Sequence, residues 1–285
     1  MLKLDRLDWA DGLAITTFGL QVGIRVTDAS FLDSIKEILP FGWEVSSNLD
    51  VDYLYSVVVG SETAGGRIRR KSVVYSDILV LETSQTPSGI LDALKRDIHL
   101  FVGEMAKGRI FLHSGVVGWK KKAVLLPGLT FTGKSTLVAA LVRAGATYYS
   151  DEFAVLDADG RVHPFARPLS LRDTNSYSGS TVRAEEIGGT TGSVPLPVGT
   201  VIATTFLAGG TWAPRRQSSG EAILWMLANS LSARRQPEKV LPILTLVAEG
   251  ADFFSGPRGE AAEVAGLILS LAGSNSSGIL KLRGS

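Results

Sequence analysis

The sequence predicts a mixed α/β (α+β) protein built from two units and a tail. Three observations support this prediction. Short alternating apolar runs fill the first 90 residues, and residues 123–144 read as an apolar strand, a glycine-bounded turn and an amphipathic helix. In addition, 45% of the residues are hydrophobic. A chain of 285 residues with this composition can bury a core in each of two units.

The first predicted unit spans residues 1–90 and is a small α+β module. Residues 15–26 alternate between apolar and polar types, which predicts one strand. Residues 28–39 have helical spacing and end before Pro40. The module carries no catalytic motif, so we expect it to serve in packing, substrate docking or dimerisation. Further short strands are expected at residues 43–45, 53–59, 71–75 and 78–82.

The second predicted unit spans residues 91–273, and residues 274–285 are expected to form a flexible tail. A helix is expected at about residues 89–107, with Ser88 as its N-cap. Residues 174–200 are rich in serine, threonine and glycine, which predicts a long loop.

Two strands of the second unit are expected at residues 111–117 and 123–126. Only a short basic turn separates them, so they predict a β-hairpin. A plain doubly wound sheet would need a long crossover at this point. An antiparallel pair therefore leads into the most informative motif of the chain.

Residues 128–135, GLTFTGKS, fit the phosphate-loop pattern G-x-x-x-x-G-K-[ST] without a mismatch. Such a loop turns backbone N–H groups toward an anion, and the helix that follows adds its positive end. Lys134 is expected to reach the outer phosphates and Ser135 to bind Mg²⁺. No Asn-Lys-x-Asp guanine motif is present, which disfavours a GTPase, while the preference for ATP or GTP stays open. The expected nucleotide contacts are Gly128, Leu129, Thr130, Phe131, Thr132, Gly133, Lys134, Ser135 and Thr136.

Two carboxylates, Asp151 and Glu152, follow the next short strand. Ligands of open α/β sheets bind at the carboxyl ends of strands, so we expect Asp151 to face the nucleotide. It can hold Mg²⁺ or accept a proton from an attacking hydroxyl, and Glu152 can serve as a second metal ligand. The residues alone leave His113 open between a packing role and a functional one.

Residues 111–171 resemble the catalytic domain of HPr kinase/phosphorylase, whose nucleotide-binding fold is shared with phosphoenolpyruvate carboxykinase. The spacing of His113 and Asp151 around Lys134 agrees with the layout of that family. The segment at residues 167–172 and the N-terminal module are more similar to HPr-kinase-like proteins of peptide-modification clusters, such as lasso-peptide kinases. The resemblance is carried by LHSGVV at residues 112–117, the loop at 128–136, Gly145, and SDE at 150–152.

This resemblance implies an ATP-dependent kinase that phosphorylates a hydroxyl group, with a serine of a protein or peptide as the acceptor. It implies Asp151 as the general base and His113 as the neighbour that orients it or tunes its charge. Arg215, which precedes a predicted helix together with Arg216, is our candidate for stabilising the transferring phosphoryl group. Relatives are often oligomeric, which leaves a homo-oligomer open.

The chain also departs from the family pattern. Residues 130–132 replace a glycine-rich middle of the loop, and Glu152 stands where the family has aspartate. Residues 182–189 match the family's downstream acidic segment only loosely, so metal ligation by Glu185 or Glu186 and a phosphorylase activity stay open. Two other functions also stay open: a kinase of a free amino acid or sugar, and a nucleotide-binding regulator without transfer activity.

The overall composition argues against several classes of protein. A formal net charge of +1 disfavours binding to nucleic acid or to a membrane surface. The absence of cysteine excludes disulfides, a cysteine nucleophile and thiolate metal sites. The N-terminus does not resemble a signal peptide, and no apolar run reaches the ~20 residues that cross a bilayer. We therefore expect a cytoplasmic protein without nucleic-acid or membrane partners.

Overall fold

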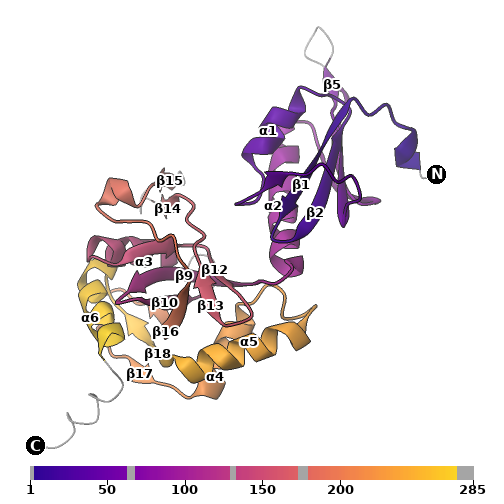
Figure 1. Ribbon diagram of the computed structural model, residues 1–285. Helices are drawn as coiled ribbons and strands as arrows, with labels where there is room; N and C mark the ends of the chain where they lie inside the picture. The colour runs from indigo at the N-terminus through magenta and orange to yellow at the C-terminus, as the bar shows by residue number, and fades with distance from the viewer. Residues whose placement is uncertain (1–2, 63–67, 129–132, 173–178, 275–285) are drawn as a thin grey trace, which may run out of the picture. The chain divides into compact units, whose positions relative to one another are not determined.

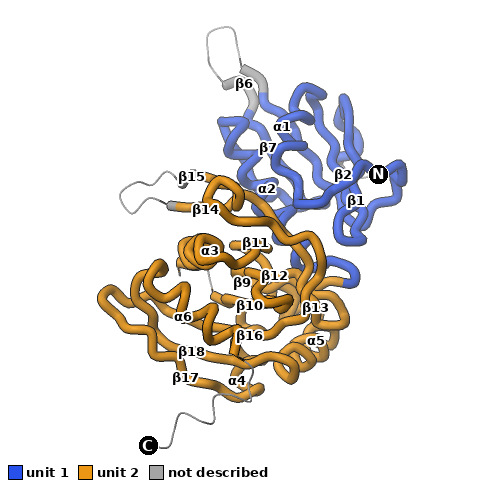
Figure 2. Tube along the Cα trace, turned by 60° about the vertical axis from the view of Figure 1, so that its left-hand side comes forward, with its two compact units in different colours: residues 1–108 blue, residues 109–285 orange. Residues whose placement is uncertain are grey.

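The computed structural model describes residues 3–62, 68–128, 133–172 and 179–274 (Figure 1). The chain divides into two compact units, Met1–Gly108 and Arg109–Ser285 (Figure 2). Each unit combines helices with β-sheet, so the protein is of the mixed α/β kind. The division falls at residue 108 rather than near residue 90, because the helix that begins at Pro87 packs on the N-terminal sheet.

The N-terminal unit contains a six-stranded sheet with the strand order β3-β1-β2-β4-β7-β8. Its core joins the buried faces of the strands to apolar residues of α1 and α2, among them Ile35, Leu94 and Ile98. A short pair, β5 (Ser61–Glu62) and β6 (Ile68–Arg70), stands apart from this sheet. The other elements are η1 (Lys3–Arg6), β1 (Asp11–Thr17), β2 (Leu20–Val26), α1 (Phe31–Glu37), β3 (Glu44–Val45), β4 (Tyr53–Val58), β7 (Ser72–Ser76), β8 (Leu79–Ser84) and α2 (Pro87–Met105).

The prediction of one strand at residues 15–26 is wrong. The structure has two antiparallel strands there, with Thr17 paired to Leu20. Phe18 and Gly19 form the turn between them with φ values of 45° and 75°. Two consecutive positive φ angles are typical of the tight turns that join hairpin strands. The alternation of apolar and polar residues continues through the turn, so the sequence pattern gave no sign that the strand ends at Thr17.

The predicted N-cap of the following long helix is also wrong. Helix α2 begins at Pro87, and the side chain of Thr86 accepts a hydrogen bond from the backbone N–H of Gly89. Proline is favoured at the first helical position because its missing N–H would have had no partner there. Thr86 therefore takes the capping role that the sequence analysis assigned to Ser88.

The C-terminal unit contains an eight-stranded sheet with helices on both faces (Figure 1). Helices α3 and α6 pack on one face around Leu126 and Ile202, and α4 and α5 pack on the other around Leu112 and Leu125. The elements of the sheet layer are β9 (Ile110–Trp119), β10 (Lys122–Pro127), β11 (Thr147–Ser150), β12 (Phe153–Leu156), β13 (Arg161–His163), β16 (Leu196–Phe206), β17 (Arg215–Arg216) and β18 (Asp252–Arg258). The helices are α3 (Lys134–Arg143), α4 (Ser219–Ala228), α5 (Pro237–Gly250) and α6 (Ala261–Gly273).

The pairing of these strands brings distant segments to one edge of the sheet. The strand order is β10-β9-β12-β13-β16-β18-β17, with β11 beside β9 and a further pairing of β10 with β16. β10 runs parallel to β16, and β16 runs parallel to β18. The carboxyl ends of these three strands, at Pro127, Phe206 and Arg258, therefore lie at the same edge. Ligands of parallel sheets bind at such an edge.

The predicted hairpin that leads into the phosphate-loop motif is confirmed. β9 and β10 are antiparallel, with Trp119 paired to Lys122. The turn residues Lys120 and Lys121 have φ values of 47° and 64°, as a two-residue hairpin turn requires.

The predicted long loop at residues 174–200 is only partly correct. Residues 173–178 and 275–285 lie outside the described residues. The described part of the predicted loop contains η2 (Glu185–Ile187) and the first residues of β16. It also contains β15 (Gly179–Val182), which pairs with β14 (Leu169–Arg172). Strand β16 forms through pairing with the distant strands β10 and β18, which local composition does not reveal.

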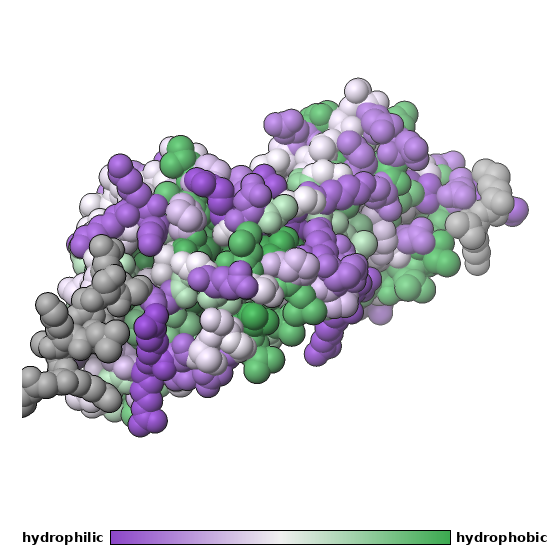
Figure 3. Space-filling view, turned by 60° about the horizontal axis from the view of Figure 1, so that its bottom comes forward, coloured by the Kyte–Doolittle hydropathy of each residue, from purple (hydrophilic) through white to green (hydrophobic). Residues whose placement is uncertain are grey.

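The surface of the molecule mixes polar and apolar side chains, as one face shows (Figure 3). The exposed large apolar side chains of α4 and α5 are Leu224, Trp225, Leu241 and Leu246. Among the described residues, no helix combines the length and the apolar character needed to span a bilayer.

A buried hydroxyl holds β9 and β10 together next to the motif. Ser114 is fully buried; its Oγ donates to the carbonyl oxygen of Gly115 at 2.8 Å and accepts from the N–H of Leu126 at 3.1 Å. We expect Ser114→Ala to lower the free energy of unfolding by about 1–3 kcal/mol, because it removes both buried hydrogen bonds of this hydroxyl. Urea unfolding followed by circular dichroism measures the change. Ser219→Ala, at an exposed serine, should cost less than about 0.5 kcal/mol, and equal losses in the two variants would contradict this account.

Candidate functional site

The described part of the phosphate-loop motif lies between β10 and α3. Strand β10 ends at Pro127, Gly128 follows it, and Gly133 is the N-cap of α3. Lys134, Ser135 and Thr136 are thus the first three residues of the helix. The other four predicted nucleotide contacts, Leu129, Thr130, Phe131 and Thr132, lie outside the described residues.

Gly133 suits its position for two physical reasons. Its backbone is left-handed, with φ 77° and ψ 23°, a conformation that glycine adopts without strain. A Cβ atom at this position would lie 2.7 Å from Nη2 of Arg258. A glycine N-cap also has no side chain with which to bond the first N–H groups of α3. The positive end of the helix is therefore left uncapped by this residue, as an anion site requires.

Strand β9 joins the start of the loop to the acidic residues. The N–H of Gly128 donates to the carbonyl oxygen of His113 at 3.1 Å. The N–H of the next residue, Ser114, donates to the carbonyl oxygen of Glu152 at 3.1 Å. Gly128, at the start of the motif, and the bend at Asp151 and Glu152 thus lie on opposite sides of the same two residues of β9. The described residues that come together here are the first glycine of the motif, the acidic pair and the histidine.

The carboxylate of Asp151 is buried, with 7% of the residue exposed, and both of its oxygens accept hydrogen bonds. The N–H of Ser170 donates to Oδ2 at 3.1 Å. The hydroxyl of Tyr148 lies 3.1 Å from Oδ1 and 2.7 Å from the carbonyl oxygen of Arg167, so one proton serves two acceptors. Burial and the nearby Asp151 raise the pKa of Tyr148, which keeps this donor protonated. The carboxylate is thus oriented, and each oxygen retains a lone pair for a further partner.

Lys134 lies close enough to both carboxylates and to His113 for their charges to interact. Burial lowers the pKa of the Lys134 ammonium group, and the negative charges of Asp151 and Glu152 oppose this shift. The pKa of His113 is lowered first by burial and then by the charge of Lys134. His113 is therefore neutral at pH 7. Its ring packs against Phe153, with the ring centroids 4.9 Å apart.

Glu152 has a different environment from Asp151. Its side chain is exposed and forms an ion pair with Arg167 at 3.1 Å. Mg²⁺ in phosphate-transfer sites commonly has one or two protein ligands, with phosphate oxygens and waters as the rest. Ser135, in the first turn of α3, and the carboxylates of Asp151 and Glu152, whose charges interact with Lys134, have the right chemistry for this. In the described ranges, no group of three or more His, Asp or Glu residues is arranged to hold a metal ion.

Three other residues from the sequence analysis lie away from these contacts. Glu185 and Glu186 are exposed on η2, and Glu185 accepts a hydrogen bond from Thr191 at 2.6 Å. Arg215 is exposed on the edge strand β17, where its backbone pairs with Ser255 of β18. The described contacts of these three residues therefore do not join them to the residues around β9.

Arg258 is a residue of this region that the sequence analysis missed. It is the last residue of β18, and only 2% of it is exposed. Its Nη2 donates to the carbonyl oxygen of Gly133 at 3.0 Å, across 125 positions of sequence, and its Nη1 donates to the carbonyl oxygen of Gly259 at 3.0 Å. The only local signal is an arginine between a proline and a glycine at the end of an apolar strand. That signal does not say which part of the chain the arginine contacts.

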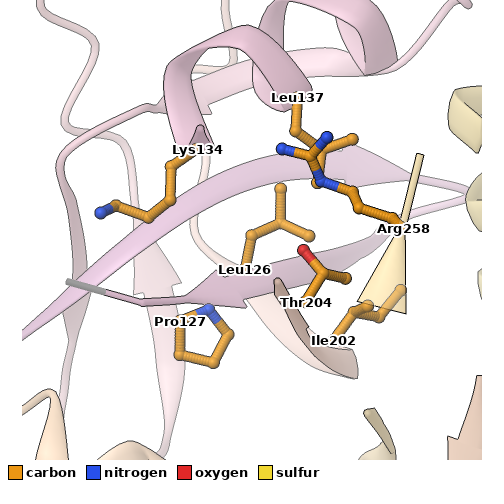
Figure 4. Close-up of a pocket in the computed structure, with 7 residues that line it drawn as sticks. All are labelled: Leu126, Pro127, Lys134, Leu137, Ile202, Thr204 and Arg258. Carbon is orange, nitrogen blue, oxygen red and sulfur yellow. The ribbon is translucent and has the colours of Figure 1, made fainter. Parts of the chain in front are cut away.

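Arg258 and Lys134 line the same pocket beside the start of α3 (Figure 4). In this view Lys134 extends from the first turn of the helix, and Arg258 reaches in from the end of β18. The hydroxyl of Thr204 points into the space between the strands and the helix. The remaining lining residues are Leu126, Pro127, Leu137 and Ile202.

No protein-family model and no curated protein matches this chain. The interpretation of the site therefore rests on its own chemistry. That chemistry consists of an uncapped helix start, a half-buried lysine, an oriented carboxylate and a neutral imidazole.

The interaction between Lys134 and His113 can be measured by NMR. We expect His113 to titrate below the usual histidine pKa of about 6.5, because burial and a nearby cation disfavour its charged form. Lys134→Met removes that cation and should raise the pKa of His113. The chain has three histidines, so few imidazole resonances are expected. The resonance that disappears in His113→Gln belongs to His113.

The control for this titration is His163, which lies 2.7 Å from Asp157. Its imidazole chemical shifts at neutral pH should be the same in the wild-type protein and in Lys134→Met. If the pKa of His113 stays unchanged or falls in Lys134→Met, the proposed arrangement of lysine and histidine is contradicted.

Proposed function

We propose that this chain is an ATP-dependent kinase that transfers the γ-phosphoryl group to a hydroxyl group of a protein or peptide. Serine is the acceptor that the resemblance to HPr kinase implies. The observation that carries the proposal is the pair of backbone hydrogen bonds made by β9. They hold Gly128, at the start of the loop, and the bend after Ser150 on either side of the same two residues. A phosphate-loop motif beside an oriented, buried carboxylate is what hydroxyl phosphorylation needs.

In the proposed reaction, the residues of this chain mainly bind charge and position the reactants. The N–H groups at the start of α3 and the ammonium group of Lys134 would bind the phosphates. Ser135 would hold Mg²⁺, which neutralises part of the phosphate charge when it is bound, and the carboxylate of Asp151 would remain free to accept a proton. The pKa of Lys134 is lowered by burial, so an anionic ligand would favour its charged form.

Asp151 is proposed as the general base. The acceptor hydroxyl oxygen forms a bond to the γ-phosphorus while the bond from that phosphorus to the β–γ bridging oxygen breaks, and ADP leaves. The proton of the hydroxyl passes to the carboxylate of Asp151. Tyr148 and Ser170 support this role because they fix the orientation of the carboxylate. His113, neutral near Lys134, adds no further positive charge to the site.

The general base can be tested with Asp151→Asn. We expect phosphoryl transfer to fall by about 10²–10⁴-fold, because the amide cannot accept the proton, while the affinity for MgATP changes little. Transfer is measured with γ-labelled ATP on an array of serine-containing peptides, and affinity is measured by calorimetry. The matched control is Asp159→Asn, at an exposed aspartate of the turn before β13, which should leave both quantities unchanged.

The same assay distinguishes the alternatives. Transfer by Asp151→Asn at the wild-type rate would contradict the assigned base. Label on free serine or a sugar, but on no peptide, would identify a small-molecule kinase. MgATP binding by the wild-type protein without transfer to any hydroxyl acceptor would instead identify a nucleotide-binding regulator.

A further inference from the structure

A buried guanidinium group lies against the closing glycine of the phosphate-loop motif. Arg258 is 2% exposed, and arginine keeps its charge in proteins. Its Nη2 and Nη1 donate to the backbone carbonyl oxygens of Gly133 and Gly259. Among the described residues, no carboxylate forms an ion pair with it, and its Nε has no hydrogen-bond partner. The group is thus a buried cation whose charge is not matched by an adjacent anion.

Such a group is costly unless something compensates its charge. Moving a cation out of water carries a large desolvation penalty, which a nearby anion offsets. Burial lowers the pKa of Arg258, and only Glu260 acts in the opposite direction. The ring of Phe206, 5.6 Å from the guanidinium carbon, adds a weak attraction for the cation. These neighbours do not replace a full counter-charge.

The position of Arg258 indicates where the missing anion belongs. Its Nη2 lies 3.0 Å from the carbonyl oxygen of Gly133, the residue immediately before the first N–H groups of α3. It shares a pocket with Lys134 and Thr204 at the carboxyl edge of the parallel strands (Figure 4). Lys134 and Arg258 therefore lie on different sides of the positive end of α3 (Figure 4). An anion bound at the start of this helix would interact favourably with the helix end and with both cations.

We infer that Arg258 is a second cation of the phosphate site, which adds its positive charge to that of Lys134 when a di- or triphosphate binds. The inference deepens the proposed function and rests on it only for the binding of phosphate by this loop; it does not depend on phosphoryl transfer. Arg258 takes the charge-neutralising role for which the sequence analysis named Arg215. The contact with Gly133 sets the distance at which this charge acts.

The experiment compares three variants of the full chain. Arg258→Met removes the charge and keeps much of the apolar volume, whereas Arg258→Lys keeps the charge with different donors. Arg143→Met is the control, because Arg143 is exposed in the last turn of α3 and its loss changes the net charge equally. Calorimetry measures the affinities for MgATP and for inorganic pyrophosphate at two salt concentrations, and melting curves without ligand report stability.

We expect Arg258→Met to weaken the binding of MgATP and pyrophosphate by tenfold or more and to reduce the salt dependence of binding. Arg258→Lys should recover a substantial part of the loss, and Arg143→Met should bind like the wild-type protein. A merely structural arginine predicts a lower melting temperature of Arg258→Met, with unchanged affinity of the folded protein.

Three results would overturn the inference. The first is wild-type affinity of Arg258→Met for both ligands. The second is Arg258→Lys binding as weakly as Arg258→Met, since charge would then not be the cause. The third is a wild-type protein that binds neither MgATP nor pyrophosphate, which would contradict the proposed function as well. By contrast, normal binding without phosphoryl transfer contradicts the kinase activity alone and leaves the role of Arg258 intact.

Discussion

Two consecutive residues of β9, His113 and Ser114, hold the parts of the candidate site together. The carbonyl oxygen of His113 accepts the N–H of Gly128, and the N–H of Ser114 donates to the carbonyl oxygen of Glu152. The hydroxyl of Ser114 also bonds β10. The distance between the phosphate-loop motif and the acidic bend is therefore set by backbone pairing across a single strand. Residues held by backbone pairing within one sheet keep a fixed distance from one another, which positions the side chains that they carry.

The charges of the site follow from this arrangement. The charge of Lys134 interacts with those of Asp151 and Glu152, and burial together with this lysine lowers the pKa of His113. On the other side of Gly133, the guanidinium of Arg258 contributes a second buried positive charge. This site is electrostatically suited to a polyphosphate, because it combines two desolvated cations, an uncapped helix start and one oriented carboxylate. Gly133 lies between the two cations, and its lack of a side chain leaves space for the guanidinium of Arg258.

Local sequence signals predicted the parts of the site that are close in sequence. The hairpin at residues 111–126 was predictable because its turn is short, and the start of α3 was predictable because glycine precedes the lysine and serine. The same reasoning failed where local patterns conflict with the backbone. The alternation at residues 15–26 continues through the turn at Phe18 and Gly19, so it predicted one strand instead of a hairpin.

Contacts between distant residues were not predictable from the sequence. Arg258 contacts Gly133 because β10, β16 and β18 are parallel neighbours in the sheet. Strand β16 joins the other two, but its first residues lie in a segment whose composition is typical of a loop, so the sequence did not predict this arrangement. Likewise, the second partner of the Asp151 carboxylate is the N–H of Ser170, a backbone group that no residue type reveals. Arg215 was chosen because it precedes a helix, but it lies exposed at the edge of the sheet.

A crystal structure with Mg²⁺ and a non-hydrolysable ATP analogue tests the central claim most directly. Our account predicts a triphosphate bound at the start of α3, with its outer phosphates beside Nζ of Lys134 and its γ-phosphate facing the carboxylate of Asp151. A nucleotide bound elsewhere, or a carboxylate of Asp151 that points away from the γ-phosphate, would contradict it.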